Sequence, residues 1–355
     1  MKCIQLLLNN NDKFIFGNHR RTIDNHYTSD RLFSNLISNL DKIGYSLSEI
    51  EEVINSFNEN NVKISSLLWG ITVIDKQRNK TVKDIYFFPF PKAYISNENI
   101  LEAKIMSHIK YISVEAIKKL KFTIQEDDVV VSGKCHDFNM KEFAIIQDKF
   151  LVLKDELEEV NNIKLFNKSI KDHNIIDRTT GMSDIYFNNY LEVNYTETIN
   201  YSYQPFMYFI LQGEITQSIQ EAIELIKYDA IGGKKSTGNG RVKDIVINEF
   251  AHRNMFNSNS KYYTNLSVVI PNKNELSNIE SYSMEIRNGY AYSSWNNDTK
   301  KPIYVIQEGA IFNNIVQGKI ADVTPIIKDY KEIKHKIYRY GKALLLPLGG
   351  DDSGK

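Results

Sequence analysis

The stretch FMYFILQGEITQSIQEAIELIKYDAIGGKKSTGNGRVKDIVI, residues 206–247, decides the fold of this chain. Its first six residues are apolar, which predicts a buried strand over 206–211. A helix is expected over 216–227, because apolar residues recur there at helical spacing: Ile215, Ile219, Ala222, Ile223 and Ile226. A glycine-rich loop at 231–241 follows, and 242–247 is again strand-like. The order is therefore strand, helix, glycine loop, strand.

The first part of the chain supplies a matching set of elements. Residues 2–8 predict a buried strand, and 29–43 predict an amphipathic helix that Thr28 or Ser29 can cap. A second helix is expected over 48–58, where Ser48 and Glu51 have capping-box spacing. Residues 63–74 have the composition of another strand.

Regularity weakens from about 80 to 200. Pro89 and Pro91 remove backbone donors, so 87–92 is not expected to form a regular interior strand. We interpret about 80–200 as a large insertion. Without it, residues 1–250 follow the βαββαβ order of a ferredoxin-like domain. Residues 251–348 predict a second, smaller domain with strands at 261–270, 282–288 and 302–307. Residues 349–355 are expected to form a tail. The expected class is α+β, with two ferredoxin-like (RRM-like) domains.

Composition limits the class of function. The 355 residues include 44 Lys and Arg against 44 Asp and Glu, so the net charge is zero and a polybasic protein is excluded. Local basic patches remain compatible with nucleic acid. Cys3 and Cys135 form no CxxC pair, and the consecutive Cys135-His136-Asp137 suits few chelate geometries, so no metal or cofactor is expected. The apolar run at the N-terminus is too short for a signal or membrane segment, which favours a cytoplasmic protein.

The glycine loop carries the clearest chemistry. Glycine lets a backbone approach a phosphate closely, successive N–H groups can bind an anion, and Lys234, Lys235 and Arg241 add positive charge. It is no Walker A loop, since Lys235 follows Gly233-Lys234 and 228 is not glycine. It also runs from helix to strand, opposite to nucleotide-binding loops. A flexible connector and an RNA- or DNA-backbone site both remain open, and the basic residues favour nucleic acid.

Four segments together carry a resemblance to a known family. A helix followed by Gly-Gly-Lys-Lys-Ser-Thr-Gly-Asn-Gly-Arg resembles the glycine-rich loop of the RAMP proteins of CRISPR effector complexes. Ser29-Asp30-Arg31-Leu32-Phe33, Asn174 to Gly181 and Tyr338-Arg339-Tyr340-Gly341-Lys342 resemble further motifs of one RAMP group, in the right order. That group is the subunit of type III-A (Csm) complexes that holds the 5′ handle of the crRNA. The chain departs from its Pro-Lys-Pro run at Phe88-Pro89-Phe90-Pro91-Lys92.

The resemblance implies a non-catalytic, structural RNA-binding subunit in antiviral defence. Its partners would be the crRNA 5′ handle, the large polymerase-like signalling subunit and the repeating RAMP backbone subunit. The expected RNA-binding residues are His19, Arg20, Arg21, His26, Ser29, Arg178, Thr179, Thr180, Gly232, Gly233, Lys234, Lys235, Ser236, Thr237, Gly238, Gly240 and Arg241.

Several of these residues have a plainer interpretation. Arg178 can instead pair with Asp177, and Asp30 can simply be a first-turn helix residue favoured by the helix dipole. Phe206 and Tyr208 lie where RRM domains stack bases, but the RRM consensus is absent, so core packing is expected for them. Aromatic residues near Arg178 suggest an interface or a stacking surface: Tyr186, Phe187, Tyr190 and Tyr195.

Two alternatives to the RNA-binding subunit stay open. The first is a metal-independent endoribonuclease that processes CRISPR RNA, with His19 and His26 as general base and acid and the nearby arginines stabilising the phosphorane. The second is a protein scaffold without RNA contacts, which leaves the basic glycine loop unexplained.

Overall fold

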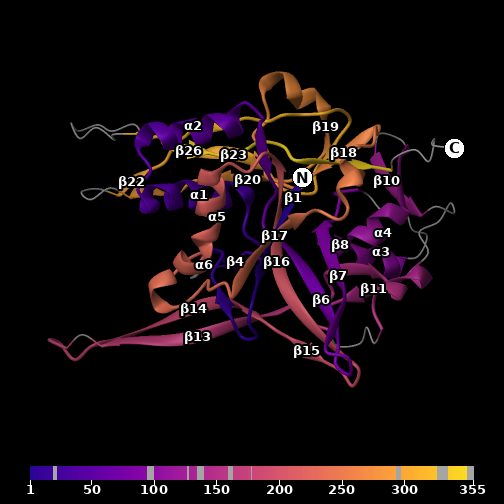
Figure 1. Cartoon of the computed structure of the whole chain (residues 1–355), viewed down its shortest axis with the longest axis horizontal. Helices are drawn as coiled ribbons and strands as arrows, with labels where there is room; N and C mark the ends of the chain where they lie inside the picture. The colour runs from indigo at the N-terminus through magenta and orange to yellow at the C-terminus, as the bar shows by residue number, and fades with distance from the viewer. Residues whose placement is uncertain are drawn as a thin grey trace.

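The computed structural model describes residues 1–18, 22–93, 100–125, 128–133, 140–158, 163–176, 178–292, 297–325 and 335–349. A large sheet runs through the middle of the molecule, helices cover one face and a C-terminal layer of strands covers part of the other (Figure 1). A long two-stranded arm, β13–β14, projects from the body (Figure 1). The architecture is α+β, as predicted.

The central sheet has the strand order β11-β12-β8-β7-β6-β16-β1-β17, and β5 and β15 also pair with β16. Its strands are β1 (Lys2–Leu7), β5 (Val62–Ile64), β6 (Leu68–Asp75), β7 (Lys80–Pro89), β8 (Tyr111–Ser113), β11 (Phe143–Ile146), β12 (Phe150–Leu153), β15 (Thr196–Glu197), β16 (Tyr201–Gly213) and β17 (Asp244–Glu249). The β8–β12 pair is parallel and the other pairs of this sheet are antiparallel. The four strands expected near 2–8, 63–74, 206–211 and 242–247 are neighbours, in the order β17-β1-β16-β6.

The prediction that 87–92 is not a regular interior strand was wrong for 87–89, whereas 90–92 lie outside the strand. The segment Lys80–Pro89 is an interior strand, β7, paired with β6 on one side and with β8 on the other. Proline is tolerated because Pro89 is the last residue of the strand and Pro91 lies beyond it. The segment interpreted as an insertion from about 80 therefore begins by extending the central sheet, which β8, β12 and β11 continue.

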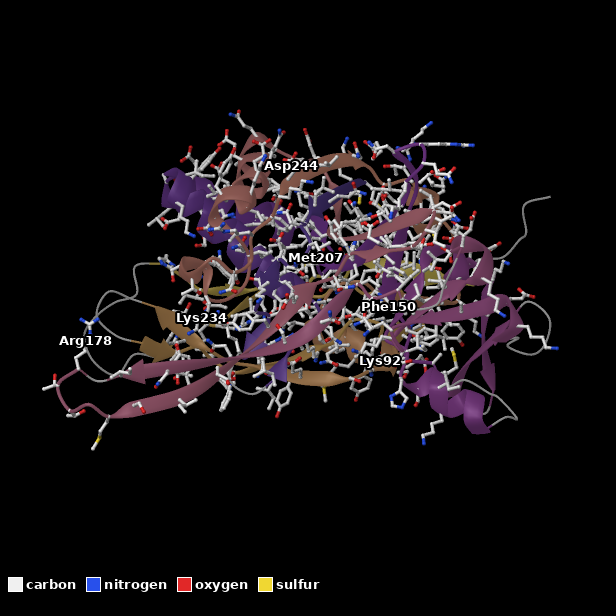
Figure 2. All side chains as sticks on the ribbon, turned by 90° about the horizontal axis from the view of Figure 1, so that it is seen from below. Lys92, Phe150, Arg178, Met207, Lys234 and Asp244 are labelled. Carbon is white, nitrogen blue, oxygen red and sulfur yellow. The ribbon has the colours of Figure 1, made fainter. Side chains whose placement is uncertain are left out.

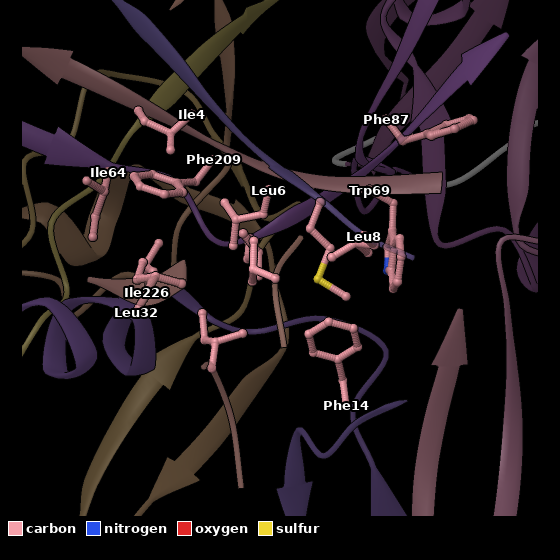
Figure 3. Close-up of a cluster of buried hydrophobic side chains, with 14 of the residues drawn as sticks. Ile4, Leu6, Leu8, Phe14, Leu32, Ile64, Trp69, Phe87, Phe209 and Ile226 are labelled. Atoms are coloured by element: carbon pink, nitrogen blue, oxygen red, sulfur yellow. The ribbon is translucent and has the colours of Figure 1, made fainter. Parts of the chain in front are cut away.

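Four helices cover one face of the sheet: α1 (Ser29–Ile43), α2 (Leu47–Asn58), α5 (Gln217–Glu224) and α6 (Ile226–Asp229). Their apolar faces meet alternate residues of the strands, because side chains along a strand point to opposite faces in turn. Ile4 and Leu6 of β1, Phe209 of β16 and Leu32 of α1 belong to this core (Figure 3). The helix expected over 216–227 is thus present, divided into α5 and α6.

The helix α2 starts one residue earlier than predicted, and its N-cap lies two residues before the predicted one. Ser46, not Ser48, is the N-cap, and it exchanges capping-box hydrogen bonds with Glu49. Glu51 instead accepts a hydrogen bond from the Tyr338 hydroxyl at 2.7 Å. Both Ser46/Glu49 and Ser48/Glu51 have capping-box spacing. The second pair does not form a capping box, and Glu51 binds Tyr338 instead.

The opposite face of the sheet is covered as well. Phe206, Tyr208 and Ile210 of β16 are buried there with Leu266 and Leu346 from the C-terminal part. This layer includes a four-stranded sheet of order β19-β24-β18-β27, formed by β18 (Tyr262–Asn265), β19 (Ile279–Ser281), β24 (Ile311–Phe312) and β27 (Leu345–Leu348). The helices α3 (Ile100–Ser107) and α4 (Val114–Lys119) lie beside it. The prediction that Phe206 and Tyr208 pack in the core is confirmed.

The remaining strands form small sheets. They are β9 (Leu120–Gln125) with β10 (Asp128–Gly133), β13 (Phe166–Ile176) with β14 (Ser183–Val193) and β2 (Lys13–Phe14), β3 (Gly17–Asn18) with β4 (Thr22–Ile23), β20 (Met284–Arg287) with β23 (Ile303–Ile306), β21 (Tyr290–Tyr292) with β22 (Asn297–Thr299), and β25 (Ala321–Asp322) with β26 (Tyr338–Arg339). Between 251 and 349 the described elements are strands and short 3-10 helices, without an α-helix. The ferredoxin-like class of the second domain therefore stays a prediction.

Candidate nucleic-acid interface

The glycine loop is held firmly against the segment that includes β2. The Gly233 amide donates to the Ile15 carbonyl at 2.9 Å, and the Gly240 amide donates to the Lys13 carbonyl at 2.7 Å. Gly240 has φ +78, and a Cβ at this position would lie 1.9 Å from the Ile231 carbonyl oxygen. Glycine is thus required by both conformation and space. The loop is a pinned structure, which disagrees with the flexible-connector interpretation.

A cleft of about 400 Å³ lies between this loop and the arm, and we call it the glycine-loop cleft. The loop forms one wall, the arm forms the opposite wall, and the end of the 9–13 turn closes it. Its lining residues are Asn11, Asp12, Lys13, Lys171, Tyr186, Asn188, Tyr190, Lys234, Thr237, Gly238, Asn239 and Arg241. Figure 2 shows Lys234 together with the arm that reaches out to Arg178.

The lining of this cleft is strongly cationic. Among its described residues four are cations, namely Lys13, Lys171, Lys234 and Arg241, and one, Asp12, is a carboxylate. The Lys234 ammonium lies 5.6 Å from the centre of the Tyr186 ring, and the Lys13 ammonium lies 5.9 Å from that of Tyr190. Lys13 is also 3.6 Å from Glu192. Positive charge beside aromatic rings is the composition that binds single-stranded nucleic acid.

Lys235 does not take part in this surface as predicted. Its ammonium lies 2.6 Å from Asp229, which also binds Lys42 at 2.7 Å. Burial alone would raise the pKa of Asp229, but the two lysines lower it, so the carboxylate stays charged. Lys235 therefore fixes the loop to α6 and α1 through Asp229, which it shares with Lys42.

Among the polar loop residues, Thr237 and Asn239 line the cleft and Ser236 does not. The Thr237 hydroxyl lines the cleft and donates to the Lys234 carbonyl at 2.8 Å, while Ser236 is exposed beside it. The Asn239 side chain donates to that carbonyl and to the Thr237 hydroxyl. These bonds hold Lys234 at φ 56, a left-handed conformation that presents it to the cleft.

Arg178, Thr179 and Thr180 lie apart from the loop. They form the exposed turn between β13 and β14, at the far end of the arm (Figure 2). Their predicted role in RNA binding would thus be exercised at a separate place. The alternative partner of Arg178, Asp177, lies outside the described residues.

Ser29 was predicted to bind RNA, and its position argues against this. The residue is fully buried, its amide donates to the Ser66 hydroxyl at 2.8 Å, and its own hydroxyl accepts from the Val268 amide at 3.0 Å. Ser29 therefore joins α1 to the C-terminal layer. His19, Arg20 and Arg21 lie outside the described residues.

His26 lines a second cleft of about 680 Å³, which we call the His26 cleft. Its ring nitrogen Nε2 is 3.3 Å from Glu308, and Nδ1 is 3.3 Å from the Tyr111 hydroxyl. Burial alone would lower the pKa of His26, but attraction to Glu308 raises it above 6.5. Burial would raise the pKa of Glu308, but His26 and the Ser66 hydroxyl bring it down to about 2. The two side chains form a buried ion pair.

This environment does not suit a general base. A base needs a free lone pair, whereas the contact with Glu308 favours the protonated form of His26, which has none. The other proposed catalytic residue, His19, lies outside the described residues. In the part of the chain that the structure describes, no cluster of three or more His, Cys, Asp and Glu side chains could hold a metal. Cys135-His136-Asp137 lies outside that part.

Two sequence motifs meet in the core. Asp30 of the first lies 2.7 Å from Arg339 of the last and 3.6 Å from Arg287. The rings of Phe33 and Tyr340 are stacked with centroids 5.3 Å apart. Both motifs thus join the helical layer to the C-terminal layer, and Asp30 has a role well beyond the helix dipole.

Sequence reasoning missed part of the glycine-loop cleft. Lys13 and Lys171 were not singled out, and Tyr186 was assigned to the neighbourhood of Arg178 instead. The turn-forming run Thr179-Thr180-Gly181, followed by the strand-favouring run Ile185-Tyr186-Phe187, is a signal that could have found the arm.

Comparison with known proteins agrees with this architecture. A solved Csm3–Csm4 subcomplex of the type III-A CRISPR–Cas interference complex contains a chain with the same fold, at TM-score 0.64 and 22% identity over 98% of this chain and 99% of that one. A Csm1–Csm4 cassette in complex with cA4 contains another, at TM-score 0.53 and 15% identity over 99% and 98%. This chain therefore shares its fold with a chain in each of these two CRISPR assemblies.

Sequence comparison gives the particular family. The model of the CRISPR Csm4 C-terminal domain matches residues 258–348. Csm4 of Methanocaldococcus jannaschii is 26% identical over 98% of both chains, and Csm4 of Streptococcus thermophilus is 25% identical over 56% of this chain and 65% of its own. Over its whole length, this chain is therefore similar to the Csm4 proteins of CRISPR systems. No helix among its described residues is long and apolar enough to cross a membrane.

Proposed function

We propose that this chain is a non-catalytic subunit that holds the 5′ repeat-derived handle of the crRNA in the glycine-loop cleft. The observation that carries the proposal is the lining of that cleft. Its described residues include four cations and two tyrosines but one carboxylate. Phosphates would bind Lys13, Lys171, Lys234 and Arg241, and bases would stack on the tyrosine rings.

The fold supports an RNA site at this place. The strand order β17-β1-β16-β6 is that expected of a ferredoxin-like domain, and we assign residues 1–250 to that class. Both faces of its sheet are buried, so RNA cannot bind across the sheet as in an ordinary RRM domain. The loop before β17 and the arm instead form a polar cleft beside the sheet.

We further propose that the chain joins the large subunit to the backbone subunits. Csm4 occurs with Csm3 in one solved assembly and with Csm1 in another, and this chain has the same fold. A protein with zero net charge and a local cationic cleft suits this role, because it can bind RNA at one place and protein at others.

The test uses the full chain and RNA that carries the repeat-derived tag. We expect Lys171→Ala/Lys234→Ala/Arg241→Ala to weaken binding and to lower the log–log salt slope by about 2, since single strands lose about 0.7 per phosphate contact. Lys80→Ala is the matched control, because Lys80 is exposed at the start of β7, away from the cleft. An unchanged slope and affinity in the triple variant would remove this cleft from the interface.

A cleavage assay tests the non-catalytic part of the proposal. We expect the purified chain to leave repeat RNA intact, with or without divalent metal, because His26 is tied to Glu308. Site-specific cleavage that is lost in His26→Gln would establish the endoribonuclease alternative.

A further inference from the structure

The His26 cleft lies apart from the glycine-loop cleft and has a different lining. Its walls are apolar and are formed by Phe90, Pro91, Met106, Ile109 and Tyr111. Polar groups converge at its inner end, and lysines stand around it. We propose that it is a second subsite for the same RNA, which takes one unstacked nucleotide with its base between the apolar walls and its phosphate against the lysines. This inference rests on the proposed function.

The size and walls of the cleft fit a base. A volume of about 680 Å³ is within the range of small-molecule sites, which combine apolar walls with a few polar groups. Unpaired bases in RNA complexes are recognised in this way, by stacking on aromatic rings and by hydrogen bonds at their edges. Phe90 and Tyr111 supply the rings.

The charges around the cleft favour a phosphate over a neutral or cationic group. Lys92, Lys110 and Lys168 line it, and its two carboxylates are already engaged, Asp24 by Arg31 at 2.6 Å and Glu308 by His26. Burial lowers the pKa of Lys92, attraction to Glu308 opposes this effect, and repulsion from Lys110 adds a smaller lowering. A bound phosphate would relieve that repulsion.

The inner end has hydrogen-bonding groups in fixed positions. His26 is oriented by Glu308, which accepts from the Ser66 hydroxyl, and Ser66 in turn accepts from the Ser29 amide. Asn25 lines the same cleft, and its side-chain oxygen is buried and accepts no hydrogen bond among the described residues. A base N–H group would satisfy this acceptor, whereas an apolar occupant would leave it unpaired at a cost.

The arm connects the two clefts. Lys168 lines the His26 cleft and Lys171 lines the glycine-loop cleft, and both belong to β13. They are three positions apart, which is about 10 Å along a strand, and the odd spacing places them on opposite faces of the hairpin. Because β13 is the edge strand of the order β13-β14-β2, one RNA backbone can cross it from one cleft to the other.

The experiment measures binding of the full chain to tag RNA in which each nucleotide in turn is replaced by an abasic residue. We expect one position to weaken binding by about tenfold because its base is lost from the His26 cleft. Ser107→Trp places a ring in the cleft from an exposed residue at the end of α3. We expect this variant to bind intact RNA about tenfold more weakly than the wild type. The abasic replacement at the sensitive position should then cause no further loss, whereas the other positions should respond as in the wild type.

Two further variants make the result decisive. Lys110→Ala, at an exposed side chain, is expected to weaken binding severalfold, whereas Lys80→Ala is not. The inference is overturned if Ser107→Trp and Lys110→Ala bind every RNA like the wild type while the glycine-loop variants still bind weakly. It is equally overturned if they impair only assembly with a protein subunit. A wild-type chain that binds no tag RNA would instead refute the proposed function itself.

Discussion

The carboxylate of Asp30 lies 2.7 Å from the guanidinium of Arg339, a residue 309 positions later in the chain. Asp30 is fully buried in the first turn of α1, and Arg339 belongs to β26 in the C-terminal layer. Burial alone would raise the pKa of Asp30, but Arg287 and Arg339 lower it, so the group is a charged carboxylate. The pair links the two ends of the chain and explains why motifs at 29–33 and 338–342 occur together.

We therefore expect Asp30→Asn to destabilise the protein. The substitution keeps the side-chain shape but leaves two buried arginines without their shared counter-ion, and breaking a buried pair costs about 3–5 kcal/mol. Chemical denaturation of the purified chain measures the loss. Asp41→Asn is the control, because Asp41 is exposed on the same helix, and it should change stability by less than about 0.5 kcal/mol. Equal effects of the two substitutions would show that the buried pair does not stabilise the fold.

Gly240→Ala should disturb the glycine loop more than an ordinary glycine substitution. The new Cβ would lie 1.9 Å from the Ile231 carbonyl oxygen, so the two ends of the loop must move apart. Gly181→Ala is the matched control, since Gly181 also has positive φ (+68) but open space around its Cβ position. There the conformation alone costs about 1–2 kcal/mol. We expect a larger loss of stability and weaker tag-RNA binding for Gly240→Ala, measured by melting and by titration; similar values for both variants would contradict the pinned loop.

The His26–Glu308 pair predicts a pH dependence of stability. The folded-state pKa of His26 is raised above 6.5, so its contribution is complete below pH 6.5 and is lost as pH rises through the folded value. The folded-state pKa of Glu308 is about 2 against an ordinary 4.5, so its contribution is complete above pH 4.5 and is lost as pH falls toward 2. The difference in unfolding free energy between wild type and His26→Gln should therefore be largest between pH 4.5 and 6.5.

His252 provides a control of opposite sign for that measurement. Its pKa is lowered, first by burial and then by Lys118, so protonation below pH 6.5 favours the unfolded chain. His252→Gln should thus gain stability relative to wild type as the pH falls. A difference that stays constant with pH for both histidines would rule out this account of the ion pair.

Two deletions of different length distinguish the base of the arm, which belongs to the core, from its outer part. If about 80–200 were an insertion, as the sequence indicates, 165–200 could be deleted without loss of the fold, but the structure argues otherwise. Phe166, Leu191 and Val193 are fully buried, and the Phe166 ring packs 4.9 Å from that of Trp69. We expect the full deletion to abolish cooperative unfolding, because it removes part of the main core.

Replacing residues 172–187 with Asn-Gly should be tolerated. Lys171 and Asn188 are directly opposite each other, so a two-residue turn can join them. The shortened chain should melt near the wild-type temperature, yet bind tag RNA more weakly because Tyr186 is lost from the glycine-loop cleft. It should also impair target recognition by a complete crRNA-guided complex. Wild-type activity of that complex would mean that the outer arm is dispensable.

The amino-acid sequence by itself determined the local elements and the family. Periodicity was enough for α1, α5, β1 and β16, because each of these elements buries one face or both and the spacing of apolar residues records it. Four motifs in order were enough for the Csm4 family, which the comparisons support. The core position of Phe206 and Tyr208 also followed from the absence of the RRM consensus.

Only the tertiary structure decided which polar residues are free to act. Ser29, Lys235 and Lys234 look equally suited to RNA in the sequence, yet Ser29 is buried, Lys235 is bound to Asp229, and Lys234 faces a cleft. Lys13 and Lys171 line the same cleft because β14 of the arm pairs with β2. Burial and ion pairing depend on contacts between residues far apart in the chain, and a local pattern carries no record of them.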